Sequence, residues 1–245
     1  YKVYDHSTTN AQVLVDVPVV VTTVSPIAIT AISADSGTSA TDFVTNDTTL
    51  TYSGTVPVEY NDANHDVFVE ILNSSGTVVQ SGTATISGSN WTLDKTASAL
   101  AAGNYTVKAD VLDLAGNAVK SATHALTIDN TNIENVSAQF INKDTVSSVG
   151  ASNTDWTVFS DGASKGQTIF GTVSTGETLT KAEISIDGGT TWMDGTLNGN
   201  LVNFYLSGVE TVGTHTYKFR TTDVAGNVSA VTSKDLIVDV LQNIS

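Results

Sequence analysis

An internal repeat is the feature that most constrains the fold of this chain. Residues 103–129 read GNYTVKADVLDLAGNAVKSATHALTID, and residues 213–239 read GTHTYKFRTTDVAGNVSAVTSKDLIVD. They align without a gap, with identities at Gly103/Gly213, Thr106/Thr216, Lys108/Lys218, Asp113/Asp223, Ala115/Ala225, Gly116/Gly226, Asn117/Asn227, Leu126/Leu236 and Asp129/Asp239. Upstream, SGTV at residues 53–56 matches FGTV at residues 170–173. Because such a repeat indicates one structural unit used twice, two tandem domains of roughly 100–110 residues are expected.

Within each repeat the apolar residues recur at every second position, as in a strand with one buried face. Val107, Ala109 and Val111 alternate with polar residues, and Gly, Asn, Asp and Ser interrupt the β-branched runs. In the first repeat this predicts strands near residues 27–33, 48–56, 66–72, 77–86, 89–94, 104–112 and 118–128. About seven short strands in about 100 residues are typical of an immunoglobulin-like sandwich. The predicted fold is therefore all-β, with tandem immunoglobulin-like β-sandwiches of about seven strands each.

The repeat also sets the expected domain boundaries. The first domain is predicted at residues 25–130 and the second at residues 131–245. Residues 1–24 repeat only weakly: YKVYD resembles Tyr105–Ala109, but no D-x-A-G-N motif follows it. These residues are therefore expected to be the closing strands of a preceding repeat or a divergent flank.

The charge balance excludes several partners. Asp and Glu number 25 against 10 Lys and Arg, which gives a net charge of −15, and Arg220 is the single arginine. Because phosphate binding needs a positive surface, nucleic acids and anionic membranes are not expected partners. No stretch is long and apolar enough to span a bilayer as a helix, so membrane insertion is not expected either. Cysteine is absent, so a secreted chain of this kind needs stiffening other than disulfides.

The excess negative charge is concentrated in motifs that recur in both repeats. The first is an acidic loop, DSGTSATDFVTND at residues 35–47, whose counterpart is residues 144–161. The second is D-x-A-G-N in the last hairpin, and the third is a single Asp that closes the last strand. The recurring aspartates are Asp35, Asp42, Asp47, Asp113 and Asp129 of the first repeat, and Asp144, Asp155, Asp161, Asp223 and Asp239 of the second.

Strand parity indicates where these carboxylates lie. If each connection reverses direction, the loop after strand one lies at the end where strand seven leaves, and the D-x-A-G-N turn lies at the opposite end. In a tandem pair, the end where strand seven leaves the first domain faces the end where the chain enters the second domain. Asp35, Asp42 and Asp47 of the first domain are then expected to meet Asp129 and Asp223 at this junction. Two unit charges about 4 Å apart repel by about 4 kcal/mol at an effective dielectric constant of about 20, so a cation is expected among them. Ca²⁺ fits best because it takes six to eight oxygen ligands, and no Cys or paired His favours zinc.

A purely structural interpretation stands beside the metal site. The Asp of D-x-A-G-N can cap its own turn, with Gly116 or Gly226 supplying a positive φ. The long acidic loop can likewise be a solvated loop. An EF-hand is excluded because its 12-residue ligand spacing is missing.

The acidic loop and the last hairpin together resemble a known family. DSGTSATDFVTNDTTLTYSGTV followed by YTVKADVLDLAGN is similar to the bacterial Ig-like repeats of giant type I-secreted adhesins and biofilm-associated proteins. The resemblance covers residues 27–240 and is looser in the second repeat, whose acidic loop is longer and altered. It implies Ca²⁺-stiffened extender modules on the bacterial cell surface, with the same ten aspartates as ligands.

Motifs that suggest catalysis are weak in this sequence. SIDGGTTW at residues 185–192 matches the Asp-box of sialidase propellers, but one box and one arginine do not make a sialidase site, so it is expected to be a hairpin turn. GASKG at residues 162–166 matches G-x-S-x-G but precedes a strand-like segment, whereas a nucleophile elbow precedes a helix. No enzymatic activity is therefore expected. Trp156 and Trp192 lie on or beside loops, where they either stack on a sugar or cover a loop or domain edge.

The leading functional hypothesis is a non-enzymatic extracellular extender segment, in which Ca²⁺ at the domain ends and junctions makes a string of domains rigid. Its expected partners are neighbouring repeats of the same chain, with a host or surface glycan as a further option, and the chain is expected to be a monomer. Two alternatives remain: a glycan- or surface-ligand-binding module of the adhesin, and an accessory domain of a secreted glycosidase.

Overall fold

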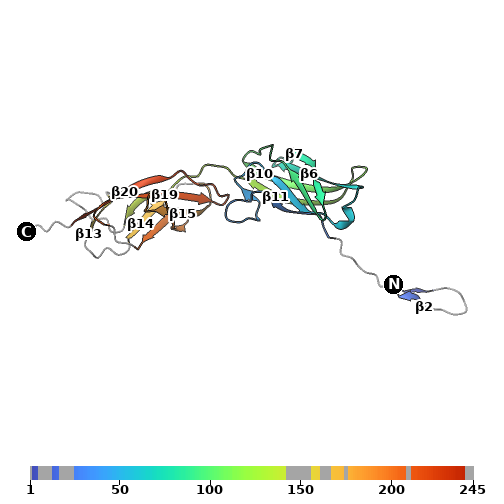
Figure 1. The fold of residues 1–245 in the computed structure, drawn as a ribbon, viewed down its shortest axis with the longest axis horizontal. Coiled ribbons are helices and arrows are strands. Elements are labelled where there is room, and N and C mark those ends of the chain that lie inside the picture. Colours follow the sequence, from blue (N-terminus) through green and yellow to red (C-terminus); the bar gives the residue numbers. More distant parts are fainter. Residues whose placement is uncertain are drawn as a thin grey trace, which may run out of the picture.

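The computed structural model describes residues 2–4, 13–16, 25–141, 156–160, 167–173, 176–207 and 211–240. The strands of residues 28–240 form two β-sandwiches that lie end to end (Figure 1). Upstream, β1 (Lys2–Tyr4) and β2 (Val13–Asp16) pair as an antiparallel hairpin. The sandwiches confirm the predicted all-β tandem fold.

The first sandwich packs a five-stranded sheet against a four-stranded sheet. The larger sheet has the order β4-β11-β10-β6-β7, with β4 (Val44–Thr45), β11 (Ala118–Ile128), β10 (Gly103–Asp113), β6 (His65–Asn73) and β7 (Val78–Thr83). The smaller sheet has the order β3-β5-β9-β8, with β3 (Ala28–Ile32), β5 (Thr51–Thr55), β9 (Asn90–Asp94) and β8 (Thr85–Ser87). One short 3-10 helix, η1 (Val58–Tyr60), follows β5.

Two details differ from the strands predicted for this domain. The single strand expected at 77–86 is two strands, β7 and β8, which belong to different sheets because the chain crosses the sandwich between them. Ala84 lies at the crossing, buried, and its N–H donates to the carbonyl of Val67. The two-residue β4 was not predicted. It pairs in parallel with the end of β11, at Thr127 and Ile128.

The second sandwich repeats this arrangement strand for strand. Its larger sheet has the order β13-β20-β19-β15-β16, with β13 (Thr157–Ser160), β20 (Thr232–Val240), β19 (Gly213–Asp223), β15 (Leu179–Ser185) and β16 (Met193–Asp194). Its smaller sheet has the order β12-β14-β18-β17, with β12 (Ser137–Ile141), β14 (Gln167–Thr172), β18 (Leu201–Leu206) and β17 (Thr196–Asn198). β13 pairs in parallel with β20, as β4 does with β11. The sequence repeat is therefore a repeat of the fold.

Each sandwich has a separate hydrophobic core, so each can fold by itself. Trp91 is fully buried in the first core, and its indole N–H donates to the carbonyl oxygen of Ala28 at 3.1 Å. Gly54 makes room for this ring, because a Cβ at position 54 would lie 2.5 Å from Trp91 Cζ2. Gly171 has the same role in the second core, where a Cβ would lie 2.5 Å from Val136 Cγ1. Close packing thus explains the glycine shared by SGTV and FGTV.

The Asp-box octet is a turn between β15 and β16. The Asp187 carboxylate accepts hydrogen bonds from Ser185 Oγ and from the backbone N–H groups of Thr190 and Thr191, and Gly188 and Gly189 supply positive φ angles. The hydrogen bonds from Thr191 above all hold the pKa of Asp187 far below its ordinary value. The hairpin expected for this octet is confirmed.

No helix in the described ranges is long and apolar enough to cross a membrane.

Candidate functional site at the domain junction

The two sandwiches meet where the acidic loop of the first, residues 35–47, contacts the Asp223–Asn227 turn of the second. Ser36 Oγ donates to the carbonyl oxygen of Ala225 at 2.6 Å. The Thr38 N–H donates to the carbonyl oxygen of Val224 at 3.3 Å. In the opposite direction, Asn227 Nδ2 donates to the carbonyl oxygen of Asp129 at 2.8 Å. Polar groups of both domains are therefore joined directly across the junction.

Gly37 lets the two backbones approach this closely. Its φ of +92° lies in the left-handed region that favours glycine. A Cβ at this position would lie 1.9 Å from the carbonyl oxygen of Val224, a distance that no side chain tolerates. The contact face at Gly37 is therefore made by backbone alone.

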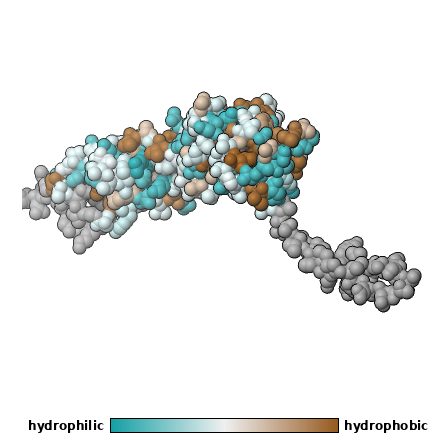
Figure 2. Space-filling view, turned by 45° about the vertical axis from the view of Figure 1, so that its right-hand side comes forward, coloured by the Kyte–Doolittle hydropathy of each residue, from teal (hydrophilic) through white to brown (hydrophobic). Residues whose placement is uncertain are grey.

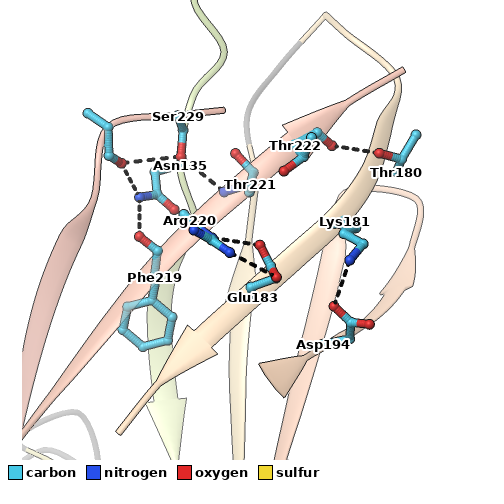
Figure 3. Close-up of polar contacts among 11 residues, drawn as sticks. Asn135, Thr180, Lys181, Glu183, Asp194, Phe219, Arg220, Thr221, Thr222 and Ser229 are labelled. Atoms are coloured by element: carbon cyan, nitrogen blue, oxygen red, sulfur yellow. Dashed lines mark hydrogen bonds and ion pairs between the residues drawn. The ribbon is translucent and has the colours of Figure 1, made fainter. Parts of the chain in front are cut away.

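The linker between the domains is bound along the second sandwich (Figure 3). Asn135 Nδ2 donates to the carbonyl oxygens of Phe219 at 2.6 Å and Ala230 at 2.5 Å, and so joins β19 to the segment that precedes β20. Thr221 Oγ1 donates to the carbonyl oxygen of Glu134 at 2.8 Å. Ile133, in the same linker, is buried. These contacts fix the direction in which the chain enters the second domain.

The acidic loop also holds two carboxylates close together next to the junction. Asp35 Oδ2 accepts a hydrogen bond from the Phe43 N–H at 3.0 Å, whereas Asp35 Oδ1 is buried and has no hydrogen-bond partner. Burial raises the pKa of Asp35, and the neighbouring Asp42 carboxylate raises it further, against the lowering effect of the Phe43 hydrogen bond. A buried carboxylate oxygen without a donor, beside a second carboxylate, is an arrangement that a cation would satisfy.

The residue after the middle aspartate has the same unusual backbone in both domains. Phe43 has a φ of +58° and Trp156 a φ of +59°, which is uncommon for bulky residues. The Phe43 carbonyl accepts from the Thr127 N–H, and the Trp156 carbonyl from the Ile237 N–H, each at 2.9 Å. Phe43 and Trp156 therefore share one backbone geometry and one hydrogen-bond pattern.

This geometry corrects the interpretation of Trp156 as a surface residue. Trp156 is only 1% exposed and belongs to the second core, so the option in which it stacks on a sugar is wrong. Trp192 is half-buried, and the Arg220 guanidinium lies over its ring, with the central carbon 4.2 Å from the ring centroid. Arg220 in turn forms a two-point ion pair with Glu183, at 2.6 and 3.2 Å (Figure 3).

The other candidate ligands in the described parts of the chain are occupied in local turns or lie on strands. Asp47 Oδ1 accepts from Thr49, and Asp129 Oδ1 accepts from Thr131. Asp113 and Asp223 each accept from the asparagine that ends their own motif, which is the turn-capping interpretation. The hydrogen bonds from Asn117 lower the pKa of Asp113. Asp239 lies on β20.

Three predicted ligands, Asp144, Asp155 and Asp161, lie outside the described residues. Among the residues that are described, no three His, Asp or Glu side chains gather as a metal site. Asp35 and Asp42 are brought together, but the wider convergence expected with Asp47, Asp129 and Asp223 is not seen.

The residues that join the domains were missed at the sequence level because they carry no charge. Ser36 and Gly37 lie inside the acidic loop, and Asn227 lies inside D-x-A-G-N. In both motifs the functional prediction was based on the neighbouring aspartates instead. The asparagine was the signal in the sequence that could have pointed to the contact. An Asp can cap its own turn without an asparagine side chain beside it, so the asparagine at both 117 and 227 indicates a further hydrogen-bond partner. Asn227 bonds its own Asp223 at 2.8 Å and also reaches across the junction.

Comparison with known proteins identifies one family for the first domain. Residues 22–130 match the model of a bacterial Ig-like domain family. A comparison with curated proteins finds no match.

Three solved structures illustrate the similarity. The fibronectin(III)-like modules of Clostridium thermocellum CbhA share 15% identity, with 89% of this chain and 98% of that chain covered and a TM-score of 0.46. The BSP domain of a biofilm associated protein shares 14% identity over 89% of this chain and 30% of that chain, with a TM-score of 0.28. The tetra-tandem repeat in the extending region of a large adhesion protein shares 21% identity over 86% of this chain and 50% of that chain, with a TM-score of 0.29.

Proposed function

Because residues 22–130 belong to the bacterial Ig-like domain family, we propose that this chain is a non-enzymatic, extracellular extender segment of a bacterial surface adhesin. Its task in this proposal is mechanical: it holds successive sandwiches at a fixed angle and so carries a binding region away from the cell. The resemblance of the acidic loop to repeats of type I-secreted adhesins supports the same role and the same export route.

One observation carries the proposal: the loop that holds the paired carboxylates is also the loop that contacts the next domain. Asp35 directly precedes Ser36, whose hydroxyl bonds the second domain, and Gly37 lies against Val224. Anything that orders Asp35 therefore also orders the junction. A loop that served only its own domain would not need this coupling.

Calcium is the proposed ordering ligand. Asp35 and Asp42 would hold the ion, and carbonyl oxygens and water would complete its shell of six to eight oxygens. Bound calcium would supply the positive charge that the buried Asp35 Oδ1 lacks. The two carboxylates position the ion, and Asp35 also fixes the left-handed turn at Phe43 through its other oxygen.

We extend the proposal to an equivalent calcium site in the second domain. Trp156 directly follows Asp155, as Phe43 follows Asp42, and the two aromatic residues share their backbone geometry. We include Asp144 and Asp155 as the corresponding pair in this proposal. Trp156, the residue after Asp155 in the sequence, accepts a hydrogen bond from the Ile237 N–H on β20.

A calcium titration followed by NMR tests the site directly. In the wild type, the amide signals of Phe43 and Ser36 are expected to shift with a Kd of about 10⁻⁴–10⁻³ M, the range of extracellular calcium modules. Asp42→Asn removes one of the two carboxylates and is expected to weaken this response at least about tenfold, because affinity follows ligand charge. Asp66→Asn removes the same charge from an exposed position on β6 and is the matched control. Unmoved Phe43 and Ser36 signals in the wild type would rule out calcium at this loop.

The raised pKa of Asp35 gives a second test through the pH dependence of stability. In calcium-free buffer the folded state binds this proton more tightly than the unfolded state does, so stability should fall as pH rises from 3.8 through the raised folded pKa. The difference in melting temperature between wild type and Asp35→Asn isolates this group. Wild type should lose stability relative to Asp35→Asn across that interval, and calcium should restore it.

Other aspartates with a shifted pKa do not affect the stability difference between wild type and Asp35→Asn. The pKa values of Asp62, Asp94, Asp113 and Asp187 are lowered, so their stabilising effect is present above the ordinary value of 3.8 and is lost below it, as pH falls through their folded pKa values. Both proteins share these groups, so they cancel in the difference. A wild type and Asp35→Asn that differ by a constant amount from pH 4 to pH 7 would contradict the burial of an ionised Asp35.

A further inference from the structure

We propose that the Asp113–Asn117 turn at the far end of the first domain is a docking surface for the acidic loop of another Ig-like domain that precedes it. This inference rests on the proposed extender function and assigns the surface by which the array continues. Its template is the observed junction, in which the matching turn of the second domain receives the loop of the first.

The two turns have the same internal structure. In each, the first Asp N–H donates to the carbonyl of the last Asn, at 3.0 Å in the first domain and 3.1 Å in the second. In each, the Asn N–H donates back to the Asp carboxylate at 2.9 Å. The carbonyls of Leu114 and Ala115 are therefore held in the same turn as those of Val224 and Ala225, which accept the bonds across the junction.

Their surroundings are opposite. In the second domain the turn is covered: Asp223 and Ala225 are fully buried, and a Cβ on Gly226 would lie 2.9 Å from the Gly37 nitrogen. In the first domain Leu114 is 81% exposed, and a Cβ on Gly116 would meet nothing within 4 Å. The same preformed turn is thus occupied in one domain and open in the other.

Exposed apolar side chains lie in the open turn and directly after it. Leu114 takes the place of Val224, and Val119 takes the place of Ser229, which is buried in the second domain, whereas Val119 is 40% exposed. Figure 2 shows hydrophobic residues on the first domain, including its end away from the second domain. Apolar residues exposed together at one end of a domain indicate a contact surface rather than a solvated turn.

The occupant that fits is a backbone loop of the Ser36–Thr38 type. The turn offers carbonyl oxygens and, at Gly116, an approach without a side chain, and a loop with a hydroxyl, a glycine and a backbone N–H complements both. A glycan or a metal ion would be selected by other groups: the Asp113 carboxylate, which either would need, already accepts bonds from Ala115 and Asn117.

Disulfide trapping in a three-domain chain tests the proposal. A second copy of residues 25–136 is placed directly before Ala28. Ala28 pairs with Thr55 as Ser137 pairs with Thr172, so this join keeps the linker length of the observed junction. The added copy has its own core and can fold. Because the chain lacks cysteine, Thr38→Cys in the added copy can be paired cleanly with Leu114→Cys in the original first domain. Peptide mapping by mass spectrometry then measures the rate of disulfide formation.

Two further pairs calibrate the result. Thr38→Cys with Val224→Cys reports the observed junction, where the backbones of these residues are hydrogen-bonded. Thr38→Cys in the added copy with Val58→Cys reports an exposed residue at the same end but off the turn. We expect the Leu114 pair to form at a rate within about threefold of the Val224 pair and at least about tenfold faster than the Val58 pair, because a disulfide needs Cα atoms within about 7 Å.

The outcomes separate the inference from the proposed function. If the Val224 pair forms and the Leu114 pair is no faster than the Val58 pair, the docking surface is wrong while the observed junction stands. If the Val224 pair also fails to form, the junction itself is wrong, and both the template and the extender proposal fall with it.

Discussion

Replacing Trp156 by alanine is expected to lower the free energy of unfolding of the second domain by about 3–5 kcal/mol, the usual cost of removing a large buried aromatic residue. The ring is 1% exposed and lies in the second core. Calorimetry can resolve this effect, because the first domain has a separate core that the change does not touch. The transition of the second domain should shift strongly while that of the first stays in place.

Trp192→Ala is the matched control in the same domain. Its ring is half-buried and the Arg220 guanidinium lies over it, so the expected loss is about 1–2 kcal/mol from the cation–π contact and partial burial. Equal effects of the two changes would contradict the core position of Trp156. An unshifted second-domain transition in Trp156→Ala would restore its interpretation as a surface residue.

Gly37→Ala is expected to open the junction. The added Cβ would lie 1.9 Å from the Val224 carbonyl oxygen, so the domains must separate and lose the bonds made by Ser36 and Thr38. Two hydrogen bonds of about 1 kcal/mol each correspond to about a 30-fold shift toward open conformations. Hydrogen exchange at the Thr38 amide should accelerate accordingly.

Gly76→Ala controls for backbone strain. Gly76 also has a positive φ, +76°, but a Cβ there would meet nothing within 4 Å. Both changes should cost stability because left-handed backbone disfavours alanine, yet only Gly37→Ala should expose the Thr38 amide. Rapid Thr38 exchange in both variants, or in neither, would contradict the steric role of Gly37.

Most of the fold could be predicted from the sequence because apolar residues alternate with polar ones along strands that bury one face. The alternation of Val107, Ala109 and Val111 gave β10 to within a residue at each end. The repeat carried the same prediction to the second domain. The split of β7 from β8 was missed because Ala84, where the chain changes sheets, is small and apolar like its strand neighbours. β4 was missed because two residues carry no periodicity.

The junction could be predicted only in part, because strand parity places loops and not side chains. Strand parity places the acidic loop of the first domain and the Asp223–Asn227 turn of the second at the junction between the domains. The structure joins the two domains there through Ser36, Thr38 and Asn227. Charge counting did not show that Asp47 and Asp223 accept hydrogen bonds within their own turns. Whether a turn satisfies its own aspartate depends on backbone geometry that composition does not encode.

Small-angle X-ray scattering of the wild-type chain, first in millimolar Ca²⁺ and then in excess EGTA, tests the central claim that calcium at the acidic loop makes the junction rigid. The account predicts one extended, rigid particle in Ca²⁺ and a broader, more flexible distribution of shapes in EGTA, with a lower melting temperature on the same samples. Scattering profiles and melting temperatures that are identical in the two buffers would contradict it. The direct hydrogen bonds of Ser36 and Thr38 would then hold the junction by themselves, and the carboxylates of the acidic loop would bind no calcium.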